Sequence, residues 1–255
     1  MDYGLIGEKL GHSFSKDIHE KIAPYTYELK EIAPADVDEF MKEKAFKAIN
    51  VTIPYKQTVI PYLDEISETA KSIGAVNVIV NKEGILSGDN TDFAGICALI
   101  GHAGVEISGK KVLILGTGGT SKTARYAAKS LKAADVLRVS RSGQEGALTY
   151  EEAYRQHKDA QVIINTTPCG MFPKTEGIPA DIERFAQLEG VIDVVYNPIE
   201  TNLVKAARAK GLPAQGGLYM LVAQAVYASA LFLGKEADET EIDSVYEWLL
   251  KEKLS

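Results

Sequence analysis

The feature that most constrains the fold is a glycine-rich segment between an apolar run and a helix-like stretch. Residues 116–121 read Gly-Thr-Gly-Gly-Thr-Ser, after VLIL at 112–115 and before KTARYAAKSL. In this order the glycines allow a tight turn and let a pyrophosphate approach backbone N–H groups at a helix N-terminus. We therefore predict a dinucleotide site at Gly116, Thr117, Gly118, Gly119 and Thr120. The alternative is a plain strand-to-helix turn.

The end of the next apolar run indicates which dinucleotide binds. It reads Val139-Ser140-Arg141-Ser142, without the acidic residue that would accept hydrogen bonds from the ribose of NAD. A guanidinium between two hydroxyls suits a 2′-phosphate. Ser140, Arg141 and Ser142 thus predict NADP, and the alternative is a solvated surface arginine.

Short apolar runs separated by helix-like segments predict an α/β protein of two domains. From Lys111 the runs VLIL, VLRVS, VIIN and VIDVV have the β-branched character of buried parallel strands, as in a doubly wound Rossmann-type domain. An earlier α/β series has apolar runs at 3–6, 25–29, 46–51 and 75–80, a helix-like segment at 64–73 and a hairpin turn at 81–84. After Gly217 the chain is helical to the end. We predict a substrate-binding domain of residues 1–100 plus 217–255, to which the C-terminal helices return, and an NADP-binding domain of residues 101–216.

Composition favours a small-molecule ligand. The formal net charge is −7 and lysines are scattered among acids, which offers no field for nucleic acid or an anionic membrane. The longest apolar stretch, residues 218–233, is short for a membrane span, and the N-terminus does not resemble a signal peptide. Two distant cysteines and four histidines lack metal-site spacing, so we expect no metal and a cytoplasmic protein. Whether it is a monomer or a homodimer stays open.

A lysine and an aspartate are candidates for chemistry. Lys56 follows a strand that ends at a proline in NVTIPYK, and Asp92 lies in the polar loop GDNTD before a helix. Carbonyl reduction with a dinucleotide needs a proton donor at the oxygen, and a neighbouring carboxylate would hold an ammonium in place for it. The alternatives are a solvated lysine and an aspartate that caps the helix.

Several segments, in order along the chain, together resemble the shikimate dehydrogenase family. They are GLIG with GHSFS, NVTIPYK, IGAVN, NTD, INTTP with Gly170-Met171, DVVYNP, and Gly217, Met220, Leu221 and Gln224 in the pattern GxxMLxxQ. The resemblance implies reversible NADPH-dependent reduction of 3-dehydroshikimate to shikimate, in aromatic amino acid (chorismate) biosynthesis.

The resemblance also implies roles for particular residues. Lys56 and Asp92 would be the catalytic pair. The substrate would be held by Ser13 and Ser15 at its carboxylate and elsewhere by Thr52, Lys56, Asn77, Asp92, Tyr196 and Gln224. The cofactor would also contact Thr166, Thr167, Pro168, Met171, Val195, Gly217 and Met220.

Two departures from the family pattern and two rival functions remain. Lys16 replaces a usual proline, and Gln144 and Glu145 stand where a second basic residue is common. One rival is a quinate or dual quinate/shikimate dehydrogenase, against which Ser15 and Arg141 argue. The other is a catalytically idle dinucleotide-binding sensor, against which Lys56 and Asp92 argue.

Overall fold

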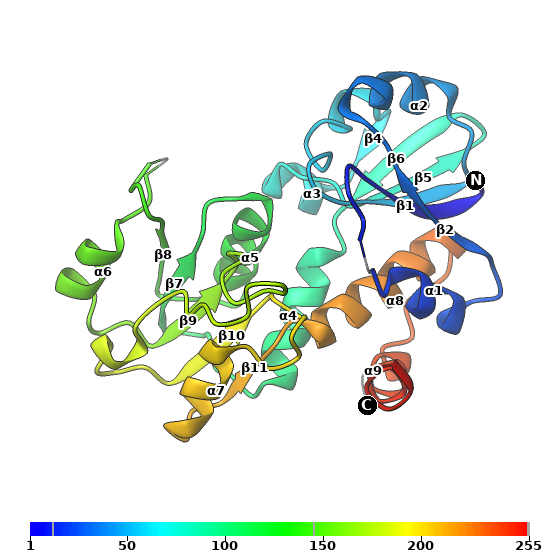
Figure 1. Ribbon diagram of the computed structural model, residues 1–255. Coiled ribbons are helices and arrows are strands. Elements are labelled where there is room, and N and C mark those ends of the chain that lie inside the picture. Colours follow the sequence, from blue (N-terminus) through cyan, green and yellow to red (C-terminus); the bar gives the residue numbers. More distant parts are fainter. Residues whose placement is uncertain (12, 145, 254–255) are drawn as a thin grey trace. The chain divides into compact units, whose positions relative to one another are not determined.

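The computed structural model describes residues 1–11, 13–144 and 146–253, so His12 and Glu145 lie outside the described residues. Contacts divide the chain into two compact units (Figure 1). Unit 1 comprises Met1–Ala94 and Val222–Ser255, and unit 2 comprises Gly95–Leu221. The two divisions fall inside helices α4 (Asp92–His102) and α8 (Leu218–Leu233).

Unit 1 contains a mixed six-stranded sheet in the order β2-β1-β3-β5-β6-β4. Its strands are β1 (Tyr3–Gly7), β2 (Tyr27–Glu31), β3 (Ala48–Val51), β4 (Glu65–Ile66), β5 (Val78–Lys82) and β6 (Ile85–Asp89). β1 is parallel to β2 and β3, β5 is antiparallel to β3 and β6, and β4 is parallel to β6. Because of these directions, the loops after β1, β3, β4 and β6 and the loop before β5 meet at one edge of the sheet.

Both faces of this sheet are covered, because successive side chains of a strand alternate between faces. Ile6, Ile49 and Ile79 belong to a cluster with Phe40 and Met41 of α2 (Val37–Glu43). Their sequence neighbours pack on the opposite face in a cluster that includes Phe232 of α8. Helices α1 (Ser15–Ile22), α3 (Glu68–Ile73) and α9 (Thr240–Lys253) and two short 3₁₀ turns, Pro34–Asp36 and Ile60–Tyr62, complete unit 1.

The segment at 64–73 differs from its predicted helix. Residues 65 and 66 form β4 and pair with Ser87 and Gly88 of β6, so the helix α3 begins only at Glu68. Ser67 caps it, since its hydroxyl accepts a hydrogen bond from the Ala70 N–H at 3.1 Å. The pairing with β6 therefore overrides the helical pattern of the first residues.

Unit 2 contains a five-stranded parallel sheet in the order β11-β10-β9-β7-β8. Its strands are β7 (Lys111–Leu115), β8 (Asp135–Val139), β9 (Val162–Asn165), β10 (Gly190–Asp193) and β11 (Ala214–Gln215). Its helices are α5 (Gly119–Ser130), α6 (Tyr150–Gln156) and α7 (Asn202–Ala209), with a 3₁₀ turn at Ile182–Arg184. The predicted α/β class, with a Rossmann-type sheet as one of two, is confirmed.

The central strands of unit 2, which are β7, β9 and β10, are largely apolar and almost wholly buried. Residues 112–115 of β7 are at most 1% exposed. Leu113 and Ile163 pack with Ala153 of α6 and Leu203 of α7 on one face. This burial fixes β7, and with it the glycine loop that follows.

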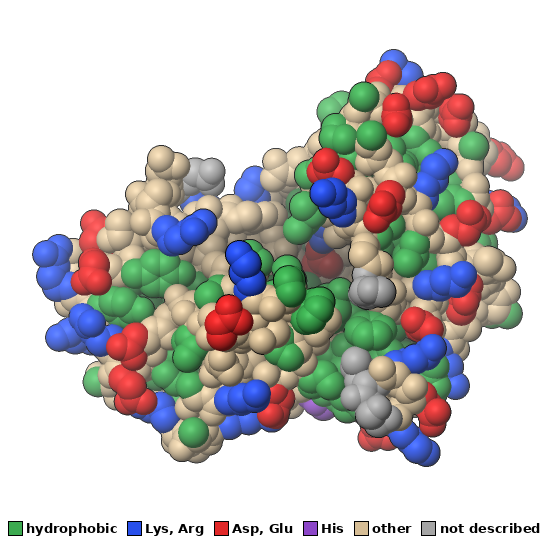
Figure 2. Space-filling view, viewed as in Figure 1, with side chains coloured by type: hydrophobic (Ala, Val, Ile, Leu, Met, Phe, Trp, Pro, Cys, Tyr) green, Lys and Arg blue, Asp and Glu red, His purple; other side chains and the backbone are tan. Residues whose placement is uncertain are grey.

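The surface is charged and mixed. On the face shown in Figure 2, Lys and Arg side chains are interspersed with Asp and Glu over both units. Among the described residues, no helix is long and apolar enough to cross a membrane.

Candidate active site

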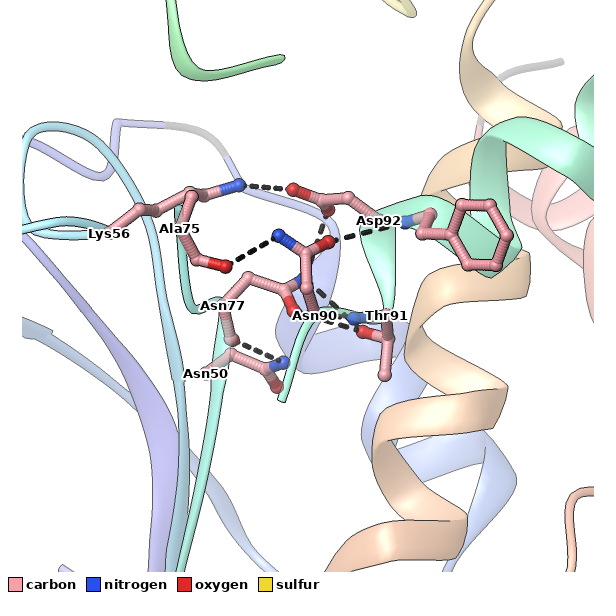
Figure 3. Close-up of polar contacts among 8 residues, drawn as sticks. Asn50, Lys56, Ala75, Asn77, Asn90, Thr91 and Asp92 are labelled. Atoms are coloured by element: carbon pink, nitrogen blue, oxygen red, sulfur yellow. Dashed lines mark hydrogen bonds and ion pairs between the residues drawn. The ribbon is translucent and has the colours of Figure 1, made fainter. Parts of the chain in front are cut away.

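Lys56 and Asp92 meet at the loop edge of the unit 1 sheet (Figure 3). Lys56 Nζ donates a hydrogen bond to Asp92 Oδ2 at 2.5 Å, and the two side chains are 18% and 9% exposed. Lys56 lies in the turn after β3, and Asp92 is the first residue of α4 after β6. They converge because β5 lies between β3 and β6 and runs antiparallel to both.

Asn77, just before β5, holds the other oxygen of Asp92. Its Nδ2 donates to Asp92 Oδ1 at 2.9 Å and to Thr91 Oγ1 at 3.2 Å, while its Oδ1 accepts from the Thr91 N–H at 2.7 Å. Since the Thr91 N–H requires an oxygen there, the Asn77 amide must turn its NH₂ toward Asp92. Both carboxylate oxygens of Asp92 are thus oriented by donors.

Asn90, and not Asp92, caps helix α4. Its Oδ1 accepts from the Phe93 N–H at 3.2 Å, and its Nδ2 donates to the Ala75 carbonyl at 2.9 Å. The carbonyl of Lys56 in turn accepts from the Val76 N–H at 2.8 Å. The capping alternative for Asp92 is therefore not what the structure shows, and the Asp92 side chain is left for Lys56 and Asn77.

Three buried residues, Asn50, Tyr27 and His19, support Asn77 from the side away from Asp92. The sequence did not reveal this role. Asn50 Nδ2 donates to the Asn77 carbonyl at 3.3 Å, and Tyr27 Oη donates to Asn50 Oδ1 at 2.6 Å. The ring of His19 stacks on Tyr27, with centroids 4.0 Å apart. Burial lowers the pKa of His19 to about 3, so the imidazole is neutral near pH 7. Asn50 lies one residue before the end of β3, at the start of NVTIPYK, and that position was the available signal.

The other predicted substrate residues of unit 1 are less tightly grouped. Ser13 Oγ donates to Ser15 Oγ at 3.0 Å, and the Ser15 N–H donates to Ser13 Oγ at 3.2 Å. Thr52 follows β3, and its methyl group lies so close to Gly7, at the end of β1, that a Cβ on Gly7 would be 2.7 Å from it. Thr52 therefore lies at the same edge of the sheet as Lys56. Gln224 is buried in the part of α8 that belongs to unit 1.

The glycine loop of unit 2 follows β7 and opens α5. Gly116 has φ +112°, and a Cβ there would lie 2.7 Å from Thr166 Oγ1, so only glycine fits. A Cβ on Gly118 or Gly119 would meet nothing within 4 Å, and no side chain caps α5. The space beside Gly118 and Gly119 is therefore open, as close approach of a phosphate to the backbone requires.

Ser121 shows why a third glycine is dispensable here. It is fully buried, and its hydroxyl donates to the Gly116 carbonyl at 2.7 Å. Thr117 and Thr120 flank the glycines and are partly exposed. The hydrogen bond between Ser121 and Gly116 thus joins the two ends of the loop, and the space beside Gly118 and Gly119 at its centre is open.

Arg141 lies beyond β8 and is exposed, as is Ser142. Ser140 is partly buried and accepts a hydrogen bond from the Gly143 N–H at 3.1 Å, which shapes the turn after the strand. An exposed guanidinium on a fixed turn is free to meet an anion.

The remaining predicted cofactor residues follow β9 and β10. Thr166 Oγ1 donates to the Leu115 carbonyl at 2.6 Å, beside the glycine loop. Thr167 and Pro168 continue this loop, and Met171 is 44% exposed. The Gly217 N–H donates to the carbonyl of buried Val195 at 2.9 Å, and a Cβ on Gly217 would lie 2.1 Å from the Val194 carbonyl oxygen. Glycine at 217 is therefore dictated by packing.

Two further predicted residues lie in unit 2. Met220 is buried in α8, and Tyr196 is partly exposed after β10, where burial raises the pKa of its phenol. Among the described residues, no cluster of histidine, cysteine, aspartate or glutamate could hold a metal ion.

Comparison with known proteins agrees with this geometry. The family described as the shikimate dehydrogenase substrate binding domain matches residues 5–79. A shikimate dehydrogenase (NADP(+)) from Clostridium perfringens is 36% identical, over 97% of each chain. The structure of shikimate 5-dehydrogenase from Thermus thermophilus in complex with NADP(H) and shikimate has a TM-score of 0.86 and 27% identity, covering 97% of this chain and 99% of that chain. Quinate dehydrogenase from Corynebacterium glutamicum in complex with NAD has a TM-score of 0.85 and 29% identity, covering 97% and 98%. From the shared sequence over nearly the whole length, the chain belongs to the shikimate dehydrogenase family.

Proposed function

We propose that the protein is an NADP-dependent shikimate dehydrogenase that reversibly reduces the ketone of 3-dehydroshikimate to the alcohol of shikimate. The observation that carries the proposal is the Lys56–Asp92 pair, 2.5 Å apart at the sheet edge, in a chain of this family. Unit 1 would bind the substrate and unit 2 the cofactor.

Lys56 is the proton donor of the proposed reaction. Reduction adds a hydride to the carbonyl carbon and a proton to the oxygen, and the Lys56 ammonium supplies that proton. Neutral Lys56 then regains a proton from water, because its side chain is 18% exposed to solvent. In the reverse direction, neutral Lys56 takes the proton from the alcohol.

Asp92 and Asn77 orient the donor. The anionic Asp92 favours the charged form of Lys56 and holds its Nζ in one place, and Asn77 fixes the carboxylate in turn. We propose that Asp92 and Asn77, with Thr52, also meet ring hydroxyls. Ser13 and Ser15 would bind the carboxylate, and Tyr196 and Gln224 complete the substrate site.

The residues of unit 2 fit a dinucleotide phosphate. The open backbone at Gly118 and Gly119, between Thr117 and Thr120, would receive the pyrophosphate, and Gly116 lets the loop after β9 approach. Arg141, with Ser140 and Ser142, would meet the 2′-phosphate of NADP. Thr166, Thr167, Pro168, Met171, Val195, Gly217 and Met220 would border the rest. When bound, NADPH supplies the hydride.

A second candidate is quinate dehydrogenation with NAD, because the chain is similar to a quinate dehydrogenase over nearly its whole length. Ser15 and Arg141 favour shikimate and NADP. Two free cysteines, Cys97 and Cys169, suit a reducing compartment, so we propose a cytoplasmic enzyme.

The test follows reduced nicotinamide by its absorbance in four parallel assays, with shikimate or quinate and with NADP or NAD. We expect turnover with shikimate and NADP to exceed the other three. Turnover mainly with quinate would establish the second candidate. Binding of NADP without turnover of either substrate would indicate a sensor and contradict the proposal.

A further inference from the structure

A second buried carboxylate lies in unit 2, at the end of β10. Asp193 is 0% exposed, and Asn165 lies opposite it in the pairing of β9 with β10. Asp193 Oδ1 accepts hydrogen bonds from Asn165 Nδ2 at 2.9 Å and from the Val195 N–H at 3.0 Å. Asp193 Oδ2 accepts from Thr201 Oγ1 at 2.7 Å. Three neutral donors from three segments thus converge on one carboxylate.

The first segment is the loop that adjoins the glycine turn. Asn165 Oδ1 accepts from the Thr167 N–H at 3.0 Å and from Thr167 Oγ1 at 2.7 Å. Because Thr167 presents two donors to it, the Asn165 amide turns its oxygen toward Thr167 and its NH₂ toward Asp193. An acceptor at Asp193 therefore fixes the amide that shapes residues 166–168.

The other two segments lead in different directions. Val195 accepts the hydrogen bond of the Gly217 N–H at 2.9 Å, so this contact reaches the start of α8. Thr201 caps α7, since its Oγ1 accepts from the Val204 N–H at 3.3 Å. The hydrogen bonds of Thr201 connect Asp193 to α7 and not to the glycine loop. A variant of Thr201 therefore serves as a control for loss of a hydrogen bond to Asp193.

We propose that Asp193 is a positioning residue for the cofactor: through Asn165 and Val195 it holds the two loops after β9 and β10 in the shape that receives NADP. This inference rests on the proposed function. Asp193 itself, being fully buried, does not touch the cofactor.

The chemistry of the site predicts which replacements it tolerates. Asparagine at 193 can keep its oxygen toward Asn165 and Val195 while its NH₂ faces Thr201, whose hydroxyl can turn to accept a hydrogen bond. Leucine at 193 leaves the Val195 N–H and the Thr201 hydroxyl without this acceptor, and leaves Asn165 Nδ2 only its 3.4 Å contact to the Thr167 carbonyl. Asn165→Leu removes the donor to Asp193 Oδ1 together with the acceptor of Thr167, and Thr201→Val removes the donor to Asp193 Oδ2 together with the cap of α7.

The experiment measures the Kd of NADP by calorimetry, and the KM values of NADP and shikimate, for the full-length protein and these four variants. We expect Asn165→Leu and Asp193→Leu to weaken NADP binding by about tenfold or more, equivalent to roughly one lost hydrogen bond, with the KM of shikimate little changed in Asn165→Leu. Asp193→Asn should bind NADP nearly as the natural protein does. Thr201→Val should lower the Tm and leave the Kd of NADP unchanged.

The outcomes separate the inference from the function on which it rests. Equal NADP affinity in natural protein and folded Asn165→Leu would overturn the positioning role, as would an equal loss in Thr201→Val. If Asp193→Leu does not fold, the comparison of Asn165→Leu with Thr201→Val decides. Failure of the natural protein to bind NADP or NAD would overturn the proposed function, and the inference with it.

Discussion

Asp92 in unit 1 and Asp193 in unit 2 have similar partners and different surroundings. Each lies at or just beyond a strand end, and each accepts a hydrogen bond from an asparagine amide at 2.9 Å. Asp92 also faces Lys56, whose side chain is partly exposed, whereas Asp193 is fully enclosed by neutral donors. With the roles proposed above, one residue type would serve two tasks. A carboxylate beside a reachable cation can support proton transfer, while an enclosed one can only hold its neighbours.

Buried titratable groups also differ between the units in the sign of their pKa shift. Burial lowers the pKa of His19 to about 3 and raises the pKa of Asp193 to about 6. In both cases burial disfavours the charged form, which is a cation for histidine and an anion for aspartate. The two units should therefore respond to pH in opposite directions.

Removing the cation is the strongest way to break the comparison. Lys56→Met keeps an unbranched side chain, one atom shorter than lysine, and leaves Asp92 with neutral donors only, as Asp193 has. We expect kcat to fall by about 10²- to 10⁴-fold, with smaller changes in KM, because the proton donor is lost. Steady-state kinetics at saturating shikimate and NADP measure this. A kcat near that of the natural protein would remove Lys56 from the chemistry.

Cofactor preference tests whether unit 2 binds the nucleotide. Arg141→Ala should lower kcat/KM for NADP by about 10- to 100-fold, the value of a charge-assisted contact of roughly 1.5–3 kcal/mol, with little effect on NAD or on the KM of shikimate. Parallel assays with both nucleotides measure the ratio, with the exposed Arg125→Ala on the outside of α5 as a matched control. An unchanged ratio would mean that another residue reads the phosphate.

The pH response of unit 1 follows from His19. Between pH 3 and 6.5 the unfolded chain binds a proton at this residue and the folded protein does not, so stability rises with pH over that range. From pH 5 to pH 7 the gain should be about 2 kcal/mol. His19→Phe, which keeps a ring against Tyr27, should lose this dependence. Urea unfolding of both proteins at the two pH values tests it, and equal pH dependence would show that His19 is charged when folded.

Asp193 should give a smaller effect of opposite sign. Between the ordinary value of 3.8 and about 6, the folded protein binds a proton here and the unfolded chain does not, so stability falls as pH rises through that range. The loss from pH 5 to pH 7 should be about 1 kcal/mol. In Asp193→Asn this contribution is absent, so the variant should gain more stability from pH 5 to 7 than the natural protein. An equal gain in the two proteins would mean that the three donors hold the carboxylate ionised over this range.

The sequence pointed to candidate site residues, but not to the contacts that hold them in place. Lys56 and Asp92 were identified from NVTIPYK and GDNTD, but their convergence depends on strand order, which the sequence does not state. The glycine loop was predictable because a strand, the glycines and a helix are consecutive. Asn90 as the cap of α4 could not be separated from Asp92, since both residue types cap helices.

From the sequence, Asp193 and Asn165 could be assigned to the motifs DVVYNP and INTTP, but not to each other. Their contact arises from the register of β9 against β10, and the direction of the Asn165 amide arises from Thr167. Local patterns carry neither kind of information. The early start predicted for α3 was wrong because residues 65 and 66 pair with β6 as a strand. This contact, too, is not visible in the local sequence.

The most direct test of the central claim, that Lys56 donates the proton, is the kcat of Lys56→Arg compared with Lys56→Met. Arginine keeps a positive charge beside Asp92 but does not release its proton at ordinary pH. We predict that both variants fall to a similar low kcat while still binding shikimate and NADP. A kcat for Lys56→Arg close to that of the natural protein would show that charge alone suffices, and would contradict the proton-donor role.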